Sequence, residues 1–146
     1  MTTIERVVAL QRVGLFAAVP GRTLAAVARR AREVDVPAGA VLIDEGAVED
    51  HLFVLVSGSL RVHRDGRTLA TLGPGATVGE LAALVPEPRS ATVTALAPSR
   101  LLRIDKPVLD EVLADGPDLA TGVIAALVAM VRERSGRDGE PGPDAG

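Results

Sequence analysis

Turn-forming residues recur at short intervals through the middle of the chain, and this rhythm restricts the fold more than any other feature of the sequence. From Val34 onwards, pairs such as Glu45-Gly46 and Asp65-Gly66 separate short apolar runs. The runs are Val41–Ile43, Leu52–Val56, Leu60–His63, Thr68–Leu72, Ala91–Leu96 and Leu101–Ile104. Such short strands and frequent turns are typical of an antiparallel β-barrel or jelly roll. Asp65-Gly66 also favours a two-residue hairpin turn.

Helical patterns precede these strands. Thr2 and Glu5 have the spacing of a capping box, in which each residue satisfies a backbone N–H at the start of a helix. A second helix is expected from about Thr23 to Arg32, where apolar residues recur at helical spacing.

Two further helices are expected after the strands. Asp105 is predicted to cap the first, which starts near Pro107. Before it, Pro98-Ser99 is predicted to form the turn between the runs Ala91–Leu96 and Leu101–Ile104. The last helix should run from Pro117 to about Arg134. The sequence therefore predicts an α+β, mainly β protein: an antiparallel β-roll or jelly-roll barrel with N-terminal helices and two C-terminal helices.

The end of the chain has a different composition. Residues 135–146 are rich in glycine, proline and acidic residues, which predicts a disordered tail. We therefore expect one domain over residues 1–134 and a tail over residues 135–146.

Composition excludes several classes of protein. The chain is 47% hydrophobic but only 1% aromatic, so its core must be aliphatic. It has no cysteine, and therefore no disulfide or thiolate metal site. A net charge of −3 argues against general nucleic-acid binding, although residues 1–33 carry six arginines against two glutamates, which we expect on solvated helix faces. Without a signal peptide or an apolar run of the ~20 residues that span a bilayer, a cytoplasmic protein is expected, with no membrane contact.

No residues form a recognisable catalytic or metal-binding pattern. His51 and His63 are the only histidines, and they fall on different predicted strands, so we expect no metal site. The sequence has no Ser-His-Asp or Cys-His arrangement and no phosphate loop with lysine, since Lys106 is its only lysine. We expect that the protein is not an enzyme.

Residues 78–93 combine the features of an anion site. Gly79-Glu80-Leu81-Ala82 is expected to form a tight turn that opens a short helix, and free N–H groups at a helix start can bind an anion. Arg89 follows two prolines and can hold a phosphate with two parallel hydrogen bonds. Glu80 would repel a phosphate, but it can accept a hydrogen bond from a sugar hydroxyl. The stretch therefore predicts a ligand that has both a phosphate and a hydroxyl group.

This stretch resembles the phosphate-binding cassette of cyclic nucleotide-binding domains, as in cyclic-AMP receptor proteins, regulatory subunits of protein kinase A and cyclic nucleotide-gated channels. The matching residues of the cassette are Gly79, Glu80, Leu81, Ala82, Pro88, Arg89, Ala91, Thr92 and Val93. Further matches to the family's β-roll are Gly39, Leu42, Gly46, Phe53, Val54, Gly58, Leu60, Val62, Gly66, Leu72 and Gly75. The resemblance covers roughly residues 4–134. It implies a sensor module whose ligand is cyclic AMP or cyclic GMP, with no other cofactor.

The resemblance also implies a role for each residue of the cassette, Gly79–Val93. Arg89 would bind the phosphate, Glu80 the ribose 2′-hydroxyl, and Ser90 the phosphate or the purine, while Gly79, Leu81 and Ala82 act through the backbone. The alternatives are that Arg89 is a rim arginine paired with Glu87 and that Glu80 only stabilises a helix N-terminus. Where several family members have an aromatic lid over the base, this chain offers only aliphatic residues: Leu127, Met130 or Val131.

The expected output of the module is a movement of the last two helices that is relayed to a partner, an effector protein of unknown identity. The segment after Arg134 is not helical in character, so the chain is not expected to bind DNA directly. The alternative is a degenerate roll that binds no nucleotide and serves for dimerisation or docking.

The last helix is also the predicted site of a homodimer. Val123–Val131 is apolar on every side, so a helix there needs cover on two faces. We expect Ile124, Leu127 and Val131 to pack on the roll, and Val123, Ala126 and Met130 to pack against a second copy. The alternative is that the first helix of the same chain folds back to cover this stripe.

Overall fold

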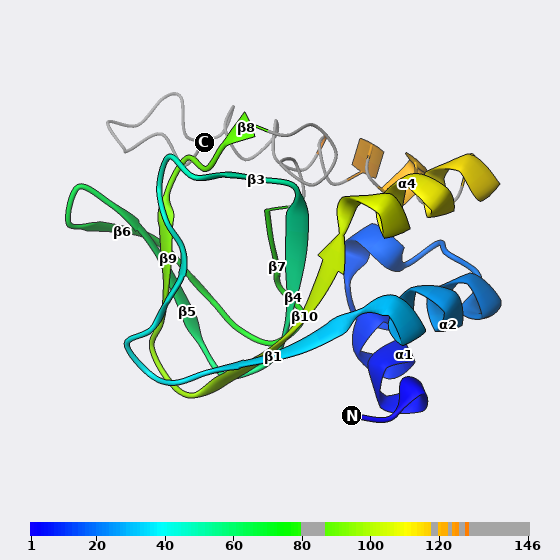
Figure 1. Cartoon of the computed structure of the whole chain (residues 1–146), viewed down its shortest axis with the longest axis horizontal. Helices are drawn as coiled ribbons and strands as arrows, with labels where there is room; N and C mark the ends of the chain where they lie inside the picture. The colour runs from blue at the N-terminus through cyan, green and yellow to red at the C-terminus, as the bar shows by residue number, and fades with distance from the viewer. Residues whose placement is uncertain (80–86, 118–119, 123, 126–127, 129–146) are drawn as a thin grey trace.

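The computed structural model of the protein describes residues 1–79, 87–117, 120–122, 124–125 and 128. Strands form a β-roll, and helices gather at one end of it (Figure 1). The α+β, mainly β architecture expected from the sequence is confirmed. The predicted tail, residues 135–146, lies outside the described residues.

The N-terminal helices are α1 (Thr3–Gln11), the 3-10 turn η1 (Gly14–Phe16) and α2 (Gly21–Arg30). The predicted capping box at the start of α1 is present, with both the Thr2 and the Glu5 hydrogen bonds made. Helix α2 begins and ends two residues earlier than expected. It stops at Arg30 because Ala31 already has extended backbone angles and the next residue starts a strand.

Eight strands of the described chain form two four-stranded antiparallel sheets. The first has the order β1 (Arg32–Val36), β10 (Ser99–Asp105), β4 (His51–Ser57), β7 (Thr77–Val78). The second has the order β2 (Val41–Ile43), β9 (Thr92–Ala95), β5 (Leu60–Arg64), β6 (Arg67–Leu72). A separate pair joins β3 (Val48–Glu49) to β8 (Glu87–Pro88). The sequence patterns did not predict β1, β3, β7 or β8, because three of these strands have only two residues and β1 is largely charged.

Strand β4 is buried on both faces and divides the core in two. Leu52 and Val54 face the helices, where they pack with residues such as Phe16. Phe53 and Leu55 alternate with them and face the interior of the roll. This double burial explains why the strand reads as a continuous apolar run.

The turn chemistry is partly as expected. Asp65 and Gly66 both have positive φ angles, 54° and 75°, and connect β5 to β6 as the predicted hairpin turn. The prediction for Pro98-Ser99 is wrong at Ser99, which is the buried first residue of β10. Its hydroxyl donates to the Ala97 carbonyl at 2.8 Å and accepts from the Ser59 amide at 3.2 Å, so it is part of the packed sheet.

Helix α4 (Lys106–Asp115) follows β10 directly, with Asp105 at its N-cap position. The Asp105 carboxylate does not cap the helix, contrary to expectation. Arg103 Nε donates to it at 2.8 Å, and this side-chain bond also holds the pKa of Asp105 below its ordinary value. Described residues of the predicted last helix, 117, 120–122, 124–125 and 128, have helical backbone.

The orientation of this last helix differs from the expectation in one respect. Gly122 is buried, and a Cβ atom at this position would overlap the Leu15 carbonyl of η1. Since successive residues turn by about 100°, Ile124 lies roughly 200° away, on the other side of the helix. Ile124 is 61% exposed and does not pack on the roll. Leu127 and Val131, the other two residues expected on the roll, lie outside the described residues. Among the described residues, no helix is long and apolar enough to span a membrane.

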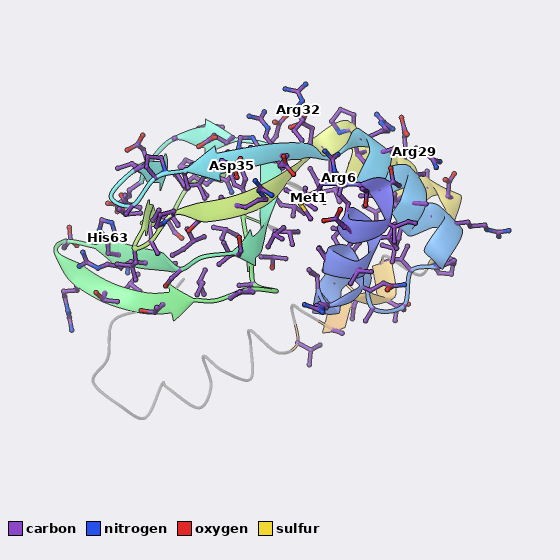
Figure 2. All side chains as sticks on the ribbon, turned by 90° about the horizontal axis from the view of Figure 1, so that it is seen from below. Met1, Arg6, Arg29, Arg32, Asp35 and His63 are labelled. Carbon is purple, nitrogen blue, oxygen red and sulfur yellow. The ribbon has the colours of Figure 1, made fainter. Side chains whose placement is uncertain are left out.

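Arg6 ties α1 to α2, and Figure 2 shows it at the helical end of the molecule. Its Nη1 atom donates to the carbonyls of Ala28 and Ala31, at 3.1 and 2.6 Å. These carbonyls lie at the C-terminus of α2, where they lack helical partners and where the helix dipole favours a cation.

We predict that Arg6→Met lowers the free energy of unfolding by about 1.5–3 kcal/mol, because two carbonyls lose a charged donor while the aliphatic packing is kept. Urea denaturation measures this change. The control is Arg22→Met on the exposed side of α2, which should lie within about 0.5 kcal/mol of wild type. Equal stabilities of the two variants would contradict the role given to Arg6.

Candidate functional site

Backbone pairing fixes the position of Arg89, the arginine singled out in the sequence. Gly46 N donates to the Arg89 carbonyl at 2.8 Å, and Arg89 N donates to the Ala47 carbonyl at 2.9 Å. These two bonds continue the β3–β8 pairing by one step (Figure 1). The segment after β8 is therefore held against the loop before β3, and the Arg89 side chain points into the molecule, where it is only 6% exposed.

The Arg89 guanidinium lies between the start of β4 and Gly79. Its Nη2 atom donates to the His51 carbonyl at 2.7 Å. On another side, Gly79 has a φ angle of +85°, and a Cβ atom there would overlap the guanidinium carbon and nitrogens. Two separate reasons therefore favour glycine at position 79: its positive φ angle, and the space beside it that Arg89 occupies.

A carboxylate and an imidazole also lie near Arg89. Glu49 Oε1 lies 4.0 Å from Arg89 Nε, and Glu49 Oε2 lies 3.0 Å from His51 Nε2. His51 is 5% exposed, and its ring meets Phe53 edge to face with 5.0 Å between centroids. Burial lowers the pKa of His51 below its ordinary value, and Arg103 acts in the same direction.

Ser90 follows Arg89 and is exposed. Its carbonyl accepts a hydrogen bond of 3.2 Å from Nη1 of Arg64, at the end of β5. Arg64 therefore holds the backbone of the cassette from the second sheet.

The structure brings together some of the predicted site residues, and others lie outside its described part. Gly79 and Arg89 are in contact, and Ser90 is adjacent to them. The predicted residues outside the described part are Glu80, Leu81, Ala82, Leu127, Met130 and Val131. The ligand contacts assigned to all of these residues stay predictions.

Sequence reasoning missed Glu49 and Arg64, and it considered His51 only as a metal ligand. Glu49 and His51 are two positions apart, a spacing that places side chains on one side of an extended chain. That spacing could have indicated from the sequence that the two side chains lie together. No local sequence pattern indicated the role of Arg64, because it contacts Ser90, which is 26 positions away in the chain.

Chemically, the described site can bind an anion. It presents a buried guanidinium beside a glycine turn, an arrangement suited to a phosphate or carboxylate. Among the described residues, no group of three or more His, Asp or Glu side chains could hold a metal ion. His63, the second histidine, instead has Nε2 2.8 Å from the Thr94 hydroxyl on β9.

Comparison with known proteins identifies the family and the fold. Residues 33–115 match the family model described as "Cyclic nucleotide-binding domain". The chain is 30% identical over 128 residues to a CRP-like cAMP-activated global transcriptional regulator of Mycobacterium tuberculosis, with 84% of this chain covered.

Solved structures agree with this assignment. The N-terminal domain of a transcriptional regulator from Streptomyces coelicolor has a TM-score of 0.73 and 35% identity, covering 87% of this chain and 92% of that one. The regulatory domain of Toxoplasma gondii PKA, solved with cAMP, has a TM-score of 0.75 and 27% identity, covering 98% of this chain and 54% of that one. The chain spans 57% of the length of the mycobacterial regulator.

We predict that Gly79→Ala destabilises the fold more than Gly39→Ala does, by about 1–3 kcal/mol. Both glycines have nearly the same φ, +85° and +86°, so both variants carry the same backbone strain. Only at Gly79 does the new methyl group meet Arg89, whereas no atom lies within 4 Å at Gly39. Thermal unfolding of the two variants measures the difference. Equal losses of stability would show that Arg89 does not fill this space.

Proposed function

Because the chain belongs to the cyclic nucleotide-binding domain family, we propose that residues 1–134 form a regulatory module that binds a cyclic nucleoside monophosphate. The observation that carries this proposal is the buried Arg89 guanidinium held beside Gly79. A buried cation gains most from an anionic partner that enters the same water-poor site. A cyclic phosphate supplies one negative charge and two oxygens for such a contact.

In the proposed complex, Arg89 binds the phosphate and backbone N–H groups of Gly79, Leu81 and Ala82 bind it from the other side. Glu80 accepts a hydrogen bond from the ribose 2′-hydroxyl, and Ser90 contacts the phosphate or the purine. The aliphatic residues Leu127, Met130 or Val131 cover the base. Cyclic AMP and cyclic GMP are the expected ligands. The cAMP-activated regulator of Mycobacterium tuberculosis and the Toxoplasma gondii PKA domain solved with cAMP support the first.

The proposed role of the module is regulatory rather than catalytic. Ligand binding shifts the last two helices, provided that the ligand binds one of two arrangements better than the other. The contact of Gly122 with the Leu15 carbonyl supports such a relay, since the last helix rests directly on η1. The partner that receives the signal is an effector protein. The absence of DNA contact by the chain itself stays a prediction, because a regulator of transcription is among its relatives.

We also propose a homodimer through the helix from Pro117 to about Arg134. Ile124 and Val128 are four residues apart and are 61% and 41% exposed, so they form an apolar stripe on one side of this helix. A two-fold axis would let the stripe bury its own copy. This stripe also fits the alternative function, a roll that serves for dimerisation without binding a nucleotide.

We predict that Arg89→Ala weakens binding of the cyclic nucleotide by tens- to thousands-fold, because loss of one partner of a buried charge contact costs on the order of 2–5 kcal/mol. Calorimetry with cyclic AMP and cyclic GMP measures the affinity. Arg89→Lys keeps the charge without the planar fork and should bind with intermediate strength.

The matched control is Arg100→Ala, which removes an exposed arginine paired with Asp35 on the first sheet. Its affinity should equal that of wild type, and the unfolding temperature of each variant reports whether the fold is intact. Wild-type affinity in folded Arg89→Ala would exclude the proposed site. Absence of nucleotide binding by the wild-type protein would favour the dimerisation module.

We predict that Ile124→Glu converts a dimer to a monomer, because a charge placed in a buried apolar stripe is not compensated. Sedimentation at micromolar concentration measures the state. Ile4→Glu is the matched control, since Ile4 on α1 is 77% exposed and receives the same charge away from the stripe. A wild-type monomer, or a dimer unchanged by Ile124→Glu, would refute this interface.

A further inference from the structure

Glu49 lies between two basic groups at the site. One of its carboxylate oxygens is 4.0 Å from Arg89 Nε, and the other is 3.0 Å from His51 Nε2. The main chain of His51 also contacts Arg89, because its carbonyl accepts the 2.7 Å hydrogen bond from Arg89 Nη2. His51 therefore contacts Arg89 through its own backbone and, through Glu49, by its side chain.

The charges that face His51 in the described chain come from three elements. Glu49 is on β3, Arg89 follows β8, and Arg103 and Asp105 are on β10, where Asp105 is the register partner of His51. The two cations lower the pKa of His51 and the two anions raise it, and Phe53 packs edge-on against the ring. Burial is the largest cause of the lowered pKa of His51, so the imidazole is neutral at pH 7. A neutral ring with hydrogen on Nε2 donates to the Glu49 carboxylate and leaves Nδ1 without a proton.

We propose that Glu49 and His51 belong to the anion site, with Glu49 as a positioning residue for Arg89, and that His51 takes up a proton when the phosphate binds. This inference rests on the proposed function and goes beyond it.

The proton moves from solvent to Nδ1 of His51, and no bond of the ligand changes. In the described part of the free site, two cations and two anions face His51. A bound phosphate diester adds a negative charge that persists across the whole range from pH 5 to 8. That charge favours the imidazolium form and raises the pKa of His51 in the complex. An imidazolium also holds the Glu49 carboxylate more strongly, which leaves the Arg89 guanidinium to the phosphate.

The sign of the pH dependence follows from linkage. The ligand binds better to the protein that carries the proton, so affinity rises as pH falls through the interval between the pKa values of His51 in the bound and free states. For one proton the slope cannot exceed tenfold per pH unit. We expect a rise of about three- to tenfold between pH 8 and pH 5.5.

The chain provides a matched control, because it has only two histidines. His63 is bonded to the Thr94 hydroxyl on the second sheet. Figure 2 shows His63 at the end of the roll away from the helices. A substitution of either histidine by glutamine removes one imidazole ring and keeps a side-chain hydrogen-bond donor.

The experiment is calorimetry of the full chain with whichever of cyclic AMP and cyclic GMP it binds, from pH 5.5 to 8. Each titration is repeated in two buffers of different ionisation enthalpy, which counts protons taken up. Wild type and His63→Gln should bind more tightly as pH falls and take up a fraction of a proton. His51→Gln should have a flat profile.

A second measurement does not depend on how well a variant folds. The imidazole proton resonances of the wild-type protein give the pKa of His51 with and without ligand, and the ligand should raise it. A flat wild-type profile, a slope retained by folded His51→Gln, or an unchanged pKa of His51 would overturn the inference and leave the proposed function standing. Absence of binding at every pH would overturn both.

Discussion

The buried guanidinium of Arg89 is the interaction on which the candidate site depends. A charge out of contact with water is costly unless nearby groups compensate for it. Here the compensation comes from the His51 carbonyl and the Glu49 carboxylate, which belong to segments about 40 positions earlier in the chain. The short β3–β8 pair brings these segments together. Without that pair, neither the cation nor its partners would be at the site.

The start of β4 connects this site to the helical end of the molecule. His51 begins β4 and holds Arg89, and the Asp50 carbonyl just before it accepts the first backbone N–H of α4, from Lys106 at 3.1 Å. The anchoring of Arg89 and the start of α4 are thus consecutive in one segment. A change in the hydrogen bond between Arg89 and His51 can therefore displace the neighbouring Asp50 carbonyl, which holds the start of α4. Such a displacement transmits a signal only if α4 has two arrangements that the ligand distinguishes.

Strand β4 lies between the two hydrophobic clusters of the core, and both clusters are largely aliphatic. Strand β4 contributes alternate residues to the helical cluster and to the interior of the roll. Both faces of the strand are buried, and closely packed aliphatic side chains fill most of the space around it. The two phenylalanines of the chain, Phe16 and Phe53, are both buried in this core.

The sequence alone determined the elements whose signals are local. The glycine turns and apolar runs predicted the antiparallel roll, and the Thr2–Glu5 spacing predicted the helix start, both from residues close together in the chain. Short-range sterics and hydrogen bonds control such features. The anion site assigned to the Gly79-to-Arg89 stretch stays a prediction.

Only the tertiary structure decided what surrounds Arg89 and which way the helices face. The cassette is contacted from strands far away in the sequence by Glu49, His51 and Arg64. No local sequence pattern predicts these contacts. Asp105 does not cap α4, because Arg103 competes for its carboxylate, and Ile124 faces outward because Gly122 packs against η1. In each case the outcome depends on a competition between partners that meet only after the chain has folded.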